Sequence, residues 1–213
     1  MKLYYFPGSC ALADHIVLEW IGEPYETVKL RASDLRSSEF LALNPAGAVP
    51  LLVDGEFTLT QNVAILSHLA ARHPWAQLFG NGTLRGRAEV LRWLAFLNSD
   101  VHPAFKPIFV PARFLPDKAI AGALAEHAIG NILRYFELLE RQLEGRSWLA
   151  DEQSVADPYL FVLLRWGVRF GIRIGEFANL EKFALRMESD PAVHSALIAE
   201  EGELIRSDYQ ARA

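Results

Sequence analysis

Hydrophobic and polar residues alternate in short runs at the start of the chain, with spacings typical first of a strand and then of a helix. Residues 2–6 are an apolar, aromatic run ended by a Pro-Gly pair, which predicts a buried strand. Residues 11–21 place apolar side chains at helical spacing, and Gly22 stands where a helix C-cap belongs. Residues 25–30 alternate apolar and polar positions, which predicts a second strand. This order implies a parallel strand pair joined by a right-handed crossover.

The following segment predicts a hairpin and another helix. Residues 34–43 are typical of a short helix or turn, and residues 51–53 of a third strand. Asp54-Gly55 is a strong hairpin signal, so we expect residues 57–60 to form a fourth strand antiparallel to the third. The chain then returns to helical spacing. Four strands and three helices in this order predict a small mixed α/β sheet domain.

The pattern changes after residue 75, where strand-like runs largely disappear. We expect a linker at 75–82 and helices beyond it, because the apolar positions follow helical spacing. The expected helices are 84–102, 117–143, 154–170, 177–188 and 191–199. The chain therefore divides into an α/β domain at 1–75 and an all-α domain at 83–213.

Composition places the chain among ordinary globular proteins and excludes several classes of partner. Hydrophobic residues make up 51% and charged residues 22% of the 213 positions. A net charge of -5 argues against a nucleic-acid partner. No apolar stretch approaches the ~18–20 residues of a membrane span. The single cysteine excludes an intrachain disulfide and, with no secretory signal pattern, leads us to expect a cytoplasmic protein.

The first candidate for chemistry is Cys10, which the pattern places at the start of the first helix. Free N–H groups and the positive end of the helix macrodipole stabilise a thiolate there, and Ser9 offers a hydroxyl beside it. The alternative is a small buried hydrophobic residue, as isolated cysteines commonly are. The position between a strand and a helix favours the reactive thiol.

Two other segments indicate a ligand site. Val49-Pro50 introduces the third strand, and a cis bond there would turn the backbone N–H and C=O of Val49 outward to pair with an extended peptide. Only about 5–6% of X–Pro bonds are cis, so the sequence alone does not establish it. Gln61-Asn62 opens the third helix, whose N-terminus suits a carboxylate, although plain helix capping explains the pair as well.

Asp100 and His102 form a further candidate pair near the end of a predicted helix. His102 is able to donate to a sulfur or an anion and Asp100 to accept from an ammonium, but a single histidine in an apolar stretch is more often structural. The other histidines have no ligand-like spacing, so we expect no metal site. Ser154 and Asp157 match a capping box that starts a buried helix, which we interpret as structural.

Together these segments resemble the cytosolic glutathione transferases, most closely the bacterial Beta class. The matching segments are MKLYYFPGSCALADHIVL, LNPAGAVPLLV, TLTQNVAILSHLA, LNSDVH and SVADPYLFVLLRW. Each is weak alone, but five in order over essentially the whole chain are highly specific. The resemblance implies a thioredoxin-like glutathione-binding domain, followed by an all-α domain with the electrophile site and dimer contacts. It also implies a detoxifying homodimer that uses glutathione as co-substrate and no other cofactor.

The resemblance assigns roles to the candidates of the first domain. Cys10 corresponds to the Beta-class cysteine that contacts the glutathione sulfur and is able to form a mixed disulfide with it. Val49 corresponds to the residue whose backbone pairs with the cysteinyl unit, and Pro50 to the cis-proline of the family. Gln61 and Asn62 occupy the positions that hold the γ-glutamyl end.

In the second domain, His102 matches a histidine near the thiol, and Asp100 matches an acidic residue that reaches the glutathione of the partner subunit. The implied catalytic residues are Cys10, Ser9 and His102. The implied glutathione-binding residues are Cys10, Val49, Pro50, Gln61, Asn62, Asp100 and His102.

Four positions depart from the Beta-class pattern. Gln61 stands in place of an acid, Pro103 in place of a lysine, and Ala95 in place of an asparagine. The lysine that the class places before the second helix has no certain counterpart, so Arg31 or Arg36 would have to substitute. Fewer cations for the glutathione carboxylates predict weaker binding.

Three functions are consistent with the sequence. The leading one is conjugation, in which the glutathione thiolate attacks a small apolar electrophile. The first alternative is a thiol–disulfide reductase with Cys10 as nucleophile, resolved by a second glutathione because no second cysteine exists. The second is a non-catalytic binding or interaction protein on the same fold. Dehalogenation, isomerisation and peroxide reduction also stay open, since no motif marks the electrophile. The candidates for its wall are Phe105, Phe109, Phe114, Trp166 and Phe170.

Overall fold

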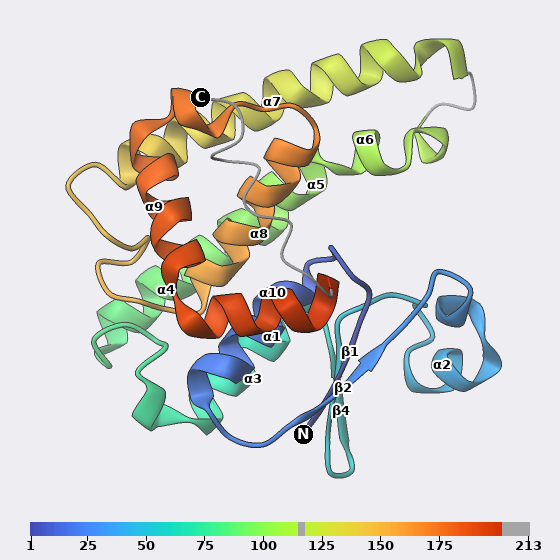
Figure 1. Cartoon of the computed structure of the whole chain (residues 1–213), viewed down its shortest axis with the longest axis vertical. Coiled ribbons are helices and arrows are strands. Elements are labelled where there is room, and N and C mark those ends of the chain that lie inside the picture. Colours follow the sequence, from blue (N-terminus) through green and yellow to red (C-terminus); the bar gives the residue numbers. More distant parts are fainter. Residues whose placement is uncertain (115–117, 202–213) are drawn as a thin grey trace.

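The computed structural model describes residues 1–114 and 118–201, which form a small sheet with its helices beside a larger helical part (Figure 1). The order of elements confirms the predicted α/β class of the first part. The elements are β1 (Lys2–Tyr5), α1 (Ala11–Ile21), β2 (Glu26–Lys29), α2 (Ser38–Leu43), β3 (Leu51–Asp54), β4 (Phe57–Thr60) and α3 (Asn62–Arg72).

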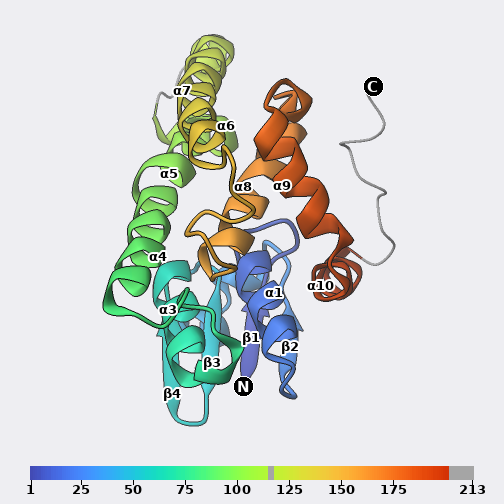
Figure 2. The same cartoon turned by 90° about the vertical axis from the view of Figure 1, so that its left-hand side faces the viewer.

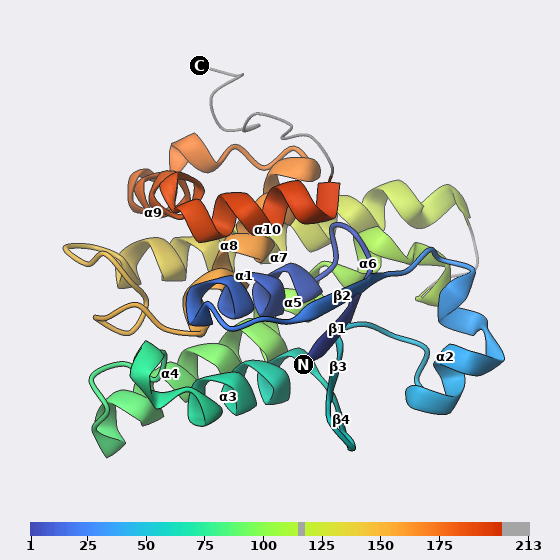
Figure 3. The ribbon, with the colours of Figure 1, turned by 60° about the horizontal axis from the view of Figure 1, so that its bottom comes forward.

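The four strands form one mixed sheet in the order β2-β1-β3-β4. Strand β1 pairs parallel with β2 and antiparallel with β3, and the β3–β4 hairpin turns at the predicted Asp54-Gly55 pair. Helices α1 and α3 lie on one side of the sheet, and α2 lies on the other (Figure 3). Phe40 of α2 is buried there with Leu30 and Leu51. The four-stranded mixed sheet is therefore as predicted and has the thioredoxin-like arrangement.

The second part is helical, as expected, over the residues that the structure describes. Its principal elements are α4 (Leu84–Phe96), a π turn η3 (Leu97–Val101), α5 (His102–Ala104), α6 (Lys106–Phe109), α7 (Ala121–Gln142), α8 (Ala156–Arg169), α9 (Ala178–Ser189) and α10 (Pro191–Glu201). No described helix is long and apolar enough to cross a membrane. Residues 115–117 and 202–213 of the expected helical domain lie outside the described residues.

Residues 84–102 are helical as predicted, but the helix is not uniform, because α4 ends at Phe96 and continues through the π turn into α5. The physical reason is Pro103, which has no N–H to donate to the carbonyl four residues earlier and whose ring crowds that carbonyl. The N–H of His102 bonds instead to the Leu97 carbonyl, five residues back. A wider turn of this kind is common at functional sites.

Helix α1 lies at the junction of the two parts. It packs against α3 on one side and against α8 and α10 on the others, and Figure 2 shows it between α3 and α10. Every residue from Ala11 to Leu18 is buried, and one continuous apolar core runs through both parts. The expected linker is also fixed to the helical part, because Val155 N–H donates to the Leu78 carbonyl at 3.0 Å.

The predicted capping box at the start of α8 is confirmed. Asp157 Oδ2 accepts from Ser154 N at 2.7 Å and from Ser154 Oγ at 3.1 Å, while Asp157 Oδ1 accepts from Leu149 N at 3.0 Å. Both Ser154 and Asp157 are fully buried. The carboxyl therefore fixes the loop before α8 as well as the first turn of the helix.

We expect Asp157→Ala to lower the free energy of unfolding by about 2–4 kcal/mol, because it leaves two buried backbone N–H groups without acceptors. Urea denaturation followed by circular dichroism measures this change. The control is Glu152→Ala, an exposed acid in the same loop, which should change stability by less than about 0.5 kcal/mol. Equal effects of the two substitutions would contradict the structural role of Asp157.

Candidate functional site

Cys10 stands at the N-terminus of α1, at the end of a tight loop. Gly8 turns this loop with a φ of 72°, in the left-handed region that favours glycine. Ser9 Oγ accepts from Ala11 N at 3.3 Å, so this hydroxyl caps the start of α1. The loop is tied to α8, because Trp166 Nε1 donates to the Gly8 carbonyl at 2.9 Å. The thiol end of the candidate site is thus built by both parts of the chain.

The Cys10 thiol is held in its neutral form. Its side chain is 8% exposed, and burial, followed by the negative charge of Asp14, raises the pKa of the thiol to about 12. Backbone N–H groups at the helix start act in the opposite direction, but burial outweighs them. In the protein without ligand, the helix N-terminus therefore lowers the pKa of the Cys10 thiol by less than burial raises it.

Asp14 is a site residue that sequence reasoning missed. It lies four residues after Cys10, on the same face of α1, and is fully buried. With the amide of Asn62 oriented so that its nitrogen faces Asp14, this nitrogen donates to Asp14 Oδ2 at 2.7 Å and to Oδ1 at 3.3 Å. Burial raises the pKa of Asp14 well above its ordinary value. The available signal was an acid one helical turn after the cysteine, in an otherwise apolar stretch.

The N-terminus of α3 carries the predicted Gln61-Asn62 pair, but the two side chains point to different surroundings. Gln61 is exposed and has a φ of 76°, a strained conformation that is often found at functional sites. Asn62 is buried and faces Asp14 inside the protein. A ligand at this end would therefore meet the Gln61 side chain and the backbone N–H groups of the first turn of α3.

The segment before β3 carries a second set of backbone groups. The Val49–Pro50 bond is cis, as the resemblance implied. Within residues 1–114 and 118–201, the N–H and C=O of Val49 make no hydrogen bond to another residue. This backbone is thus available to pair with an extended ligand.

The structure separates the two arginine candidates. A Cβ atom at Gly47, where φ is 57°, would lie 2.7 Å from Arg36 Nη1, so the Arg36 guanidinium covers the loop that leads to Val49. Arg31 is instead engaged with Asp34, at 3.2 Å between Nη2 and Oδ1. Of the two arginines, Arg36 is therefore the one whose guanidinium lies beside Gly47, two residues before Val49.

His102 belongs to a polar cluster between α5 and α8. Its Nδ1 lies 2.7 Å from the Tyr159 hydroxyl, which donates to Asn98 Oδ1 at 3.2 Å. Both bonds are satisfied when His102 Nδ1–H donates to Tyr159, and this leaves Nε2 with a lone pair. Burial, followed by the charge of Lys106, lowers the pKa of His102 to about 4, so the imidazole is neutral at pH 7.

Tyr159 was not predicted as a site residue, although it lies in the SVADPYLFVLLRW segment. Its side chain is fully buried, and burial raises the pKa of its hydroxyl. In the other orientation of the Asn62 amide, the amide nitrogen donates to the Tyr159 hydroxyl. Tyr159 therefore brings the predicted His102 into the same polar cluster as Cys10 and Asn62.

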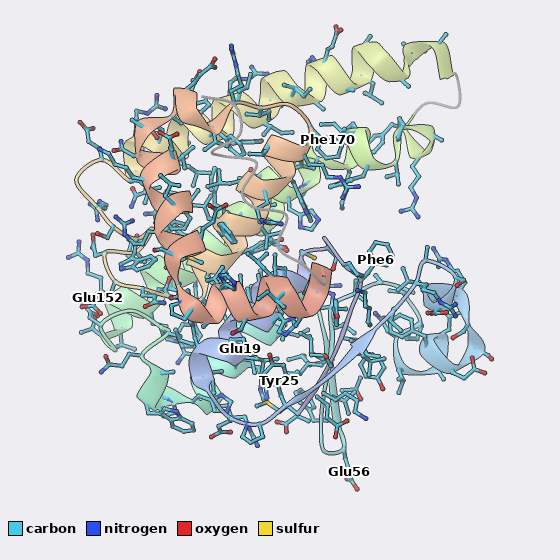
Figure 4. All side chains as sticks on the ribbon, in the orientation of Figure 1. Phe6, Glu19, Tyr25, Glu56, Glu152 and Phe170 are labelled. Carbon is cyan, nitrogen blue, oxygen red and sulfur yellow. The ribbon has the colours of Figure 1, made fainter. Side chains whose placement is uncertain are left out.

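Four of the five aromatic residues that were candidates for the electrophile wall gather next to His102, although Phe105 and Trp166 are buried in the core. Trp166 lies at their centre, with ring centroids 4.8 Å from His102 and 4.9 Å from Phe109. Phe105 and Phe170 complete the group through edge and tilted contacts. Figure 4 shows Phe170 in the helical part and Phe6 in the sheet part.

Two predicted residues lie apart from this cluster. Phe114 is 48% exposed and makes no ring contact with the four other aromatic residues in the described part of the chain. Asp100 is exposed on the π turn and lines a pocket of about 330 Å³ together with His127, Asn131 and Tyr135 of α7. The structure does not bring Asp100 to the Cys10 site of its own chain.

Comparison with protein families and known proteins agrees with the resemblance. Residues 1–71 match the N-terminal domain of glutathione S-transferases, and residues 97–191 match the C-terminal domain. The chain is 45% identical over 201 residues to Glutathione S-transferase GST-4.5 of Xanthomonas campestris, covering 94% of this chain and 98% of the relative. It is 31% identical to Glutathione S-transferase GstA of Escherichia coli O157:H7, with coverage of 94% and 98%.

Comparison with solved structures also finds glutathione S-transferases. A glutathione S-transferase from Xylella fastidiosa superposes with a TM-score of 0.91 at 40% identity, covering 95% of this chain and 99% of that one. A sphingomonad glutathione S-transferase in complex with glutathione superposes with a TM-score of 0.83 at 35% identity, with coverage of 94% and 98%. With both domains matched in order and relatives aligned over nearly their full length, the chain belongs to the glutathione S-transferase family.

Proposed function

We propose that the protein is a glutathione transferase in which glutathione lies along the Val49 backbone and attacks a small apolar electrophile. The observation that carries the proposal is the set of backbone groups without a hydrogen bond in the described residues at Val49 and in the first turn of α3. The Cys10 thiol lies at the N-terminus of α1, which would receive the sulfur of the same ligand. The sphingomonad relative, solved with glutathione, supports the same ligand.

Each part of glutathione has a partner of matching chemistry. The γ-glutamyl carboxylate meets the N–H groups of the first turn of α3, and the Gln61 side-chain oxygen accepts from the ammonium. The cysteinyl unit pairs with the N–H and C=O of Val49. The glycine carboxylate is placed near Arg36, the cation beside the loop before Val49. Arg36 thus replaces the lysine of the Beta-class pattern.

Stabilisation of the glutathione thiolate is the step that conjugation requires. The sulfur lies at the N-terminus of α1, where the helix macrodipole, the Ser9 hydroxyl and the Cys10 thiol favour its charged form. His102 is neutral and offers a lone pair to the thiol proton. The thiolate forms a carbon–sulfur bond while the leaving group departs with its electron pair. Phe109, Trp166 and Phe170 supply the apolar surface for the electrophile.

The neutral state of Cys10 favours conjugation over thiol–disulfide reduction. A reductase needs the Cys10 thiolate as its nucleophile, and a pKa of about 12 leaves very little of it at neutral pH. As a thiol, Cys10 is instead a donor toward the glutathione sulfur. The third function, a non-catalytic protein on this fold, requires that glutathione does not bind.

The proposal also assigns a separate role to each of the two parts of the chain. Residues 1–75 bind glutathione, while residues 83–213 supply the electrophile site and the contacts of a homodimer. The exposed Asp100 suits a contact with the glutathione of the partner subunit. A single cysteine and a net charge of -5 are consistent with a cytoplasmic detoxifying enzyme that has no nucleic-acid partner.

We expect alkylation of Cys10 by iodoacetamide at pH 7 to be at least about 100-fold slower than that of free cysteine, whose pKa is about 8.5. The rate should keep rising about tenfold per pH unit beyond pH 9, because the raised pKa delays formation of the thiolate. Cys10 is the only cysteine, so mass spectrometry of the labelled protein reports it alone. A rate that levels off near pH 7 would instead favour the reductase.

Cys10→Ser should abolish glutathione-dependent disulfide reduction and keep conjugation to a chlorodinitrobenzene within about tenfold of wild type, since serine is also able to donate to the glutathione sulfur. Steady-state assays of both reactions on the same preparations measure the two effects. Loss of both activities together would contradict the donor role of Cys10, because serine would then fail to replace it in conjugation, and unchanged rates in both would remove Cys10 from the site.

Arg36→Ala should raise the dissociation constant of glutathione by about tenfold, because it removes a charge-assisted hydrogen bond to the glycine carboxylate. Titration calorimetry measures this constant. Arg31→Ala is the matched control, since Arg31 is engaged with Asp34, and we expect it to change binding less than about twofold. Absence of wild-type binding at millimolar glutathione would favour the non-catalytic function.

A further inference from the structure

Asp14 is a buried acid for which the proposed reaction has no use. Its side chain is fully buried in α1, and it makes no ion pair with any residue of 1–114 or 118–201. Burying a carboxyl without a partner is costly, whereas an apolar residue would suit this run of α1. His15 is the other buried polar residue of the run, and it contacts Glu200 of α10. The position of Asp14 therefore needs a separate explanation.

The direct partner of Asp14 is Asn62, the first residue of α3. The Asn62 amide nitrogen lies 2.7 Å from Asp14 Oδ2, and Asn62 is itself 4% exposed. If Asp14 is ionised, the amide nitrogen donates to it. If Asp14 is protonated, its hydroxyl donates to the amide oxygen of the reversed side chain. The link between α1 and α3 is kept in both protonation states.

The surroundings of Asp14 come from four helices. Cys10 lies one turn before it on α1, Asn62 lies on α3, Tyr159 on α8 and Glu200 on α10. Tyr159 bonds to His102, and it also accepts from the Asn62 amide nitrogen when the amide is reversed, as it is for a protonated Asp14. A continuous set of buried polar contacts thus runs from Asp14 through Asn62 and Tyr159 to His102.

The two helices joined by Asp14 and Asn62 are the ones whose N-termini form opposite ends of the candidate glutathione site. The thiol lies at the N-terminus of α1, and the γ-glutamyl carboxylate lies at that of α3. A small change in the first turn of α3 would misdirect its N–H groups, because hydrogen bonds weaken steeply with angle.

We propose that Asp14 is a positioning residue. By its hydrogen bond to Asn62 it fixes the first turn of α3 against α1, so that the backbone N–H groups of this turn face the γ-glutamyl carboxylate. The inference rests on the proposed function, since it concerns the same glutathione site. It also explains why the Asn62 side chain points inward, while that of Gln61 is exposed.

The test compares glutathione binding and steady-state kinetics of wild type, Asp14→Ala and Asp14→Asn. Asp14→Ala should raise the dissociation constant and the KM for glutathione about tenfold, while kcat at saturating glutathione stays within about twofold. Asp14→Asn should stay within about threefold of wild type, because its amide is able to bond to Asn62. A purely structural role would lower stability without this split between KM and kcat.

A double-mutant cycle with Asn62→Ala tests whether the effect passes through the proposed bond. Asn62→Ala and the double variant should bind glutathione as weakly as Asp14→Ala, because the same bond is lost in each. The control is Trp20→Phe, a substitution on the same helix as Asp14. It removes the 3.1 Å bond from Trp20 Nε1 to Asp190, which follows α9. This control should lower the melting temperature and leave glutathione binding unchanged.

The outcomes separate the inference from the proposed function. A folded Asp14→Ala that binds glutathione like wild type overturns the positioning role alone. Additive losses in the double variant overturn it too, because they would exclude Asn62 as the route. If Asp14→Ala does not fold, Asn62→Ala tests the positioning role in its place. An Asn62→Ala variant that binds glutathione as tightly as wild type overturns the inference. Absence of glutathione binding by wild type removes the proposed function and the positioning role with it.

Discussion

The burial of α1 between the two parts of the chain is the constraint on which the site depends. Eight successive residues, Ala11 to Leu18, are buried against the sheet and against α3, α8 and α10. Burial on this scale fixes the helix within about an ångström, since packed interiors tolerate little displacement. The loop that carries Cys10 is fixed with it, through the bond from Trp166 to Gly8. The position of the thiol is therefore set by core packing rather than by the loop itself.

The same burial decides the charge of the groups at the site. A helix N-terminus is typically worth less than about 1 kcal/mol to a nearby anion. Removal from water costs a thiolate more than this, and for Cys10 it is the larger effect. Burial likewise lowers the pKa of His102, so that its imidazole stays neutral. In the proposed site, the glutathione sulfur is thus surrounded by neutral donors and dipoles, and the charge of the nucleophile develops on glutathione rather than on a protein side chain.

Local patterns predicted the parts of the fold that depend on near neighbours. The Asp54-Gly55 turn and the Ser154–Asp157 cap were visible because their partners lie within a few residues. The π turn was not, since it results from Pro103 acting on a carbonyl four residues earlier. Asp14 was missed because its partner Asn62 is distant in sequence. Arg31 and Arg36 were equivalent in the sequence, and only their contacts distinguished them.

The two halves of the proposed site differ in how freely their residues are able to vary. The proposed glutathione half uses backbone groups of Val49 and of α3, so most side-chain substitutions there leave its donors and acceptors in place. The electrophile half is made of side chains from separate helices, Phe109 of α6 and Trp166 of α8, whose packing changes with each substitution. Trp166 is the exception, because it also holds the Gly8 carbonyl. Electrophile choice is therefore open to change at Phe109 and Phe170, whereas a change at Trp166 would also disturb the thiol.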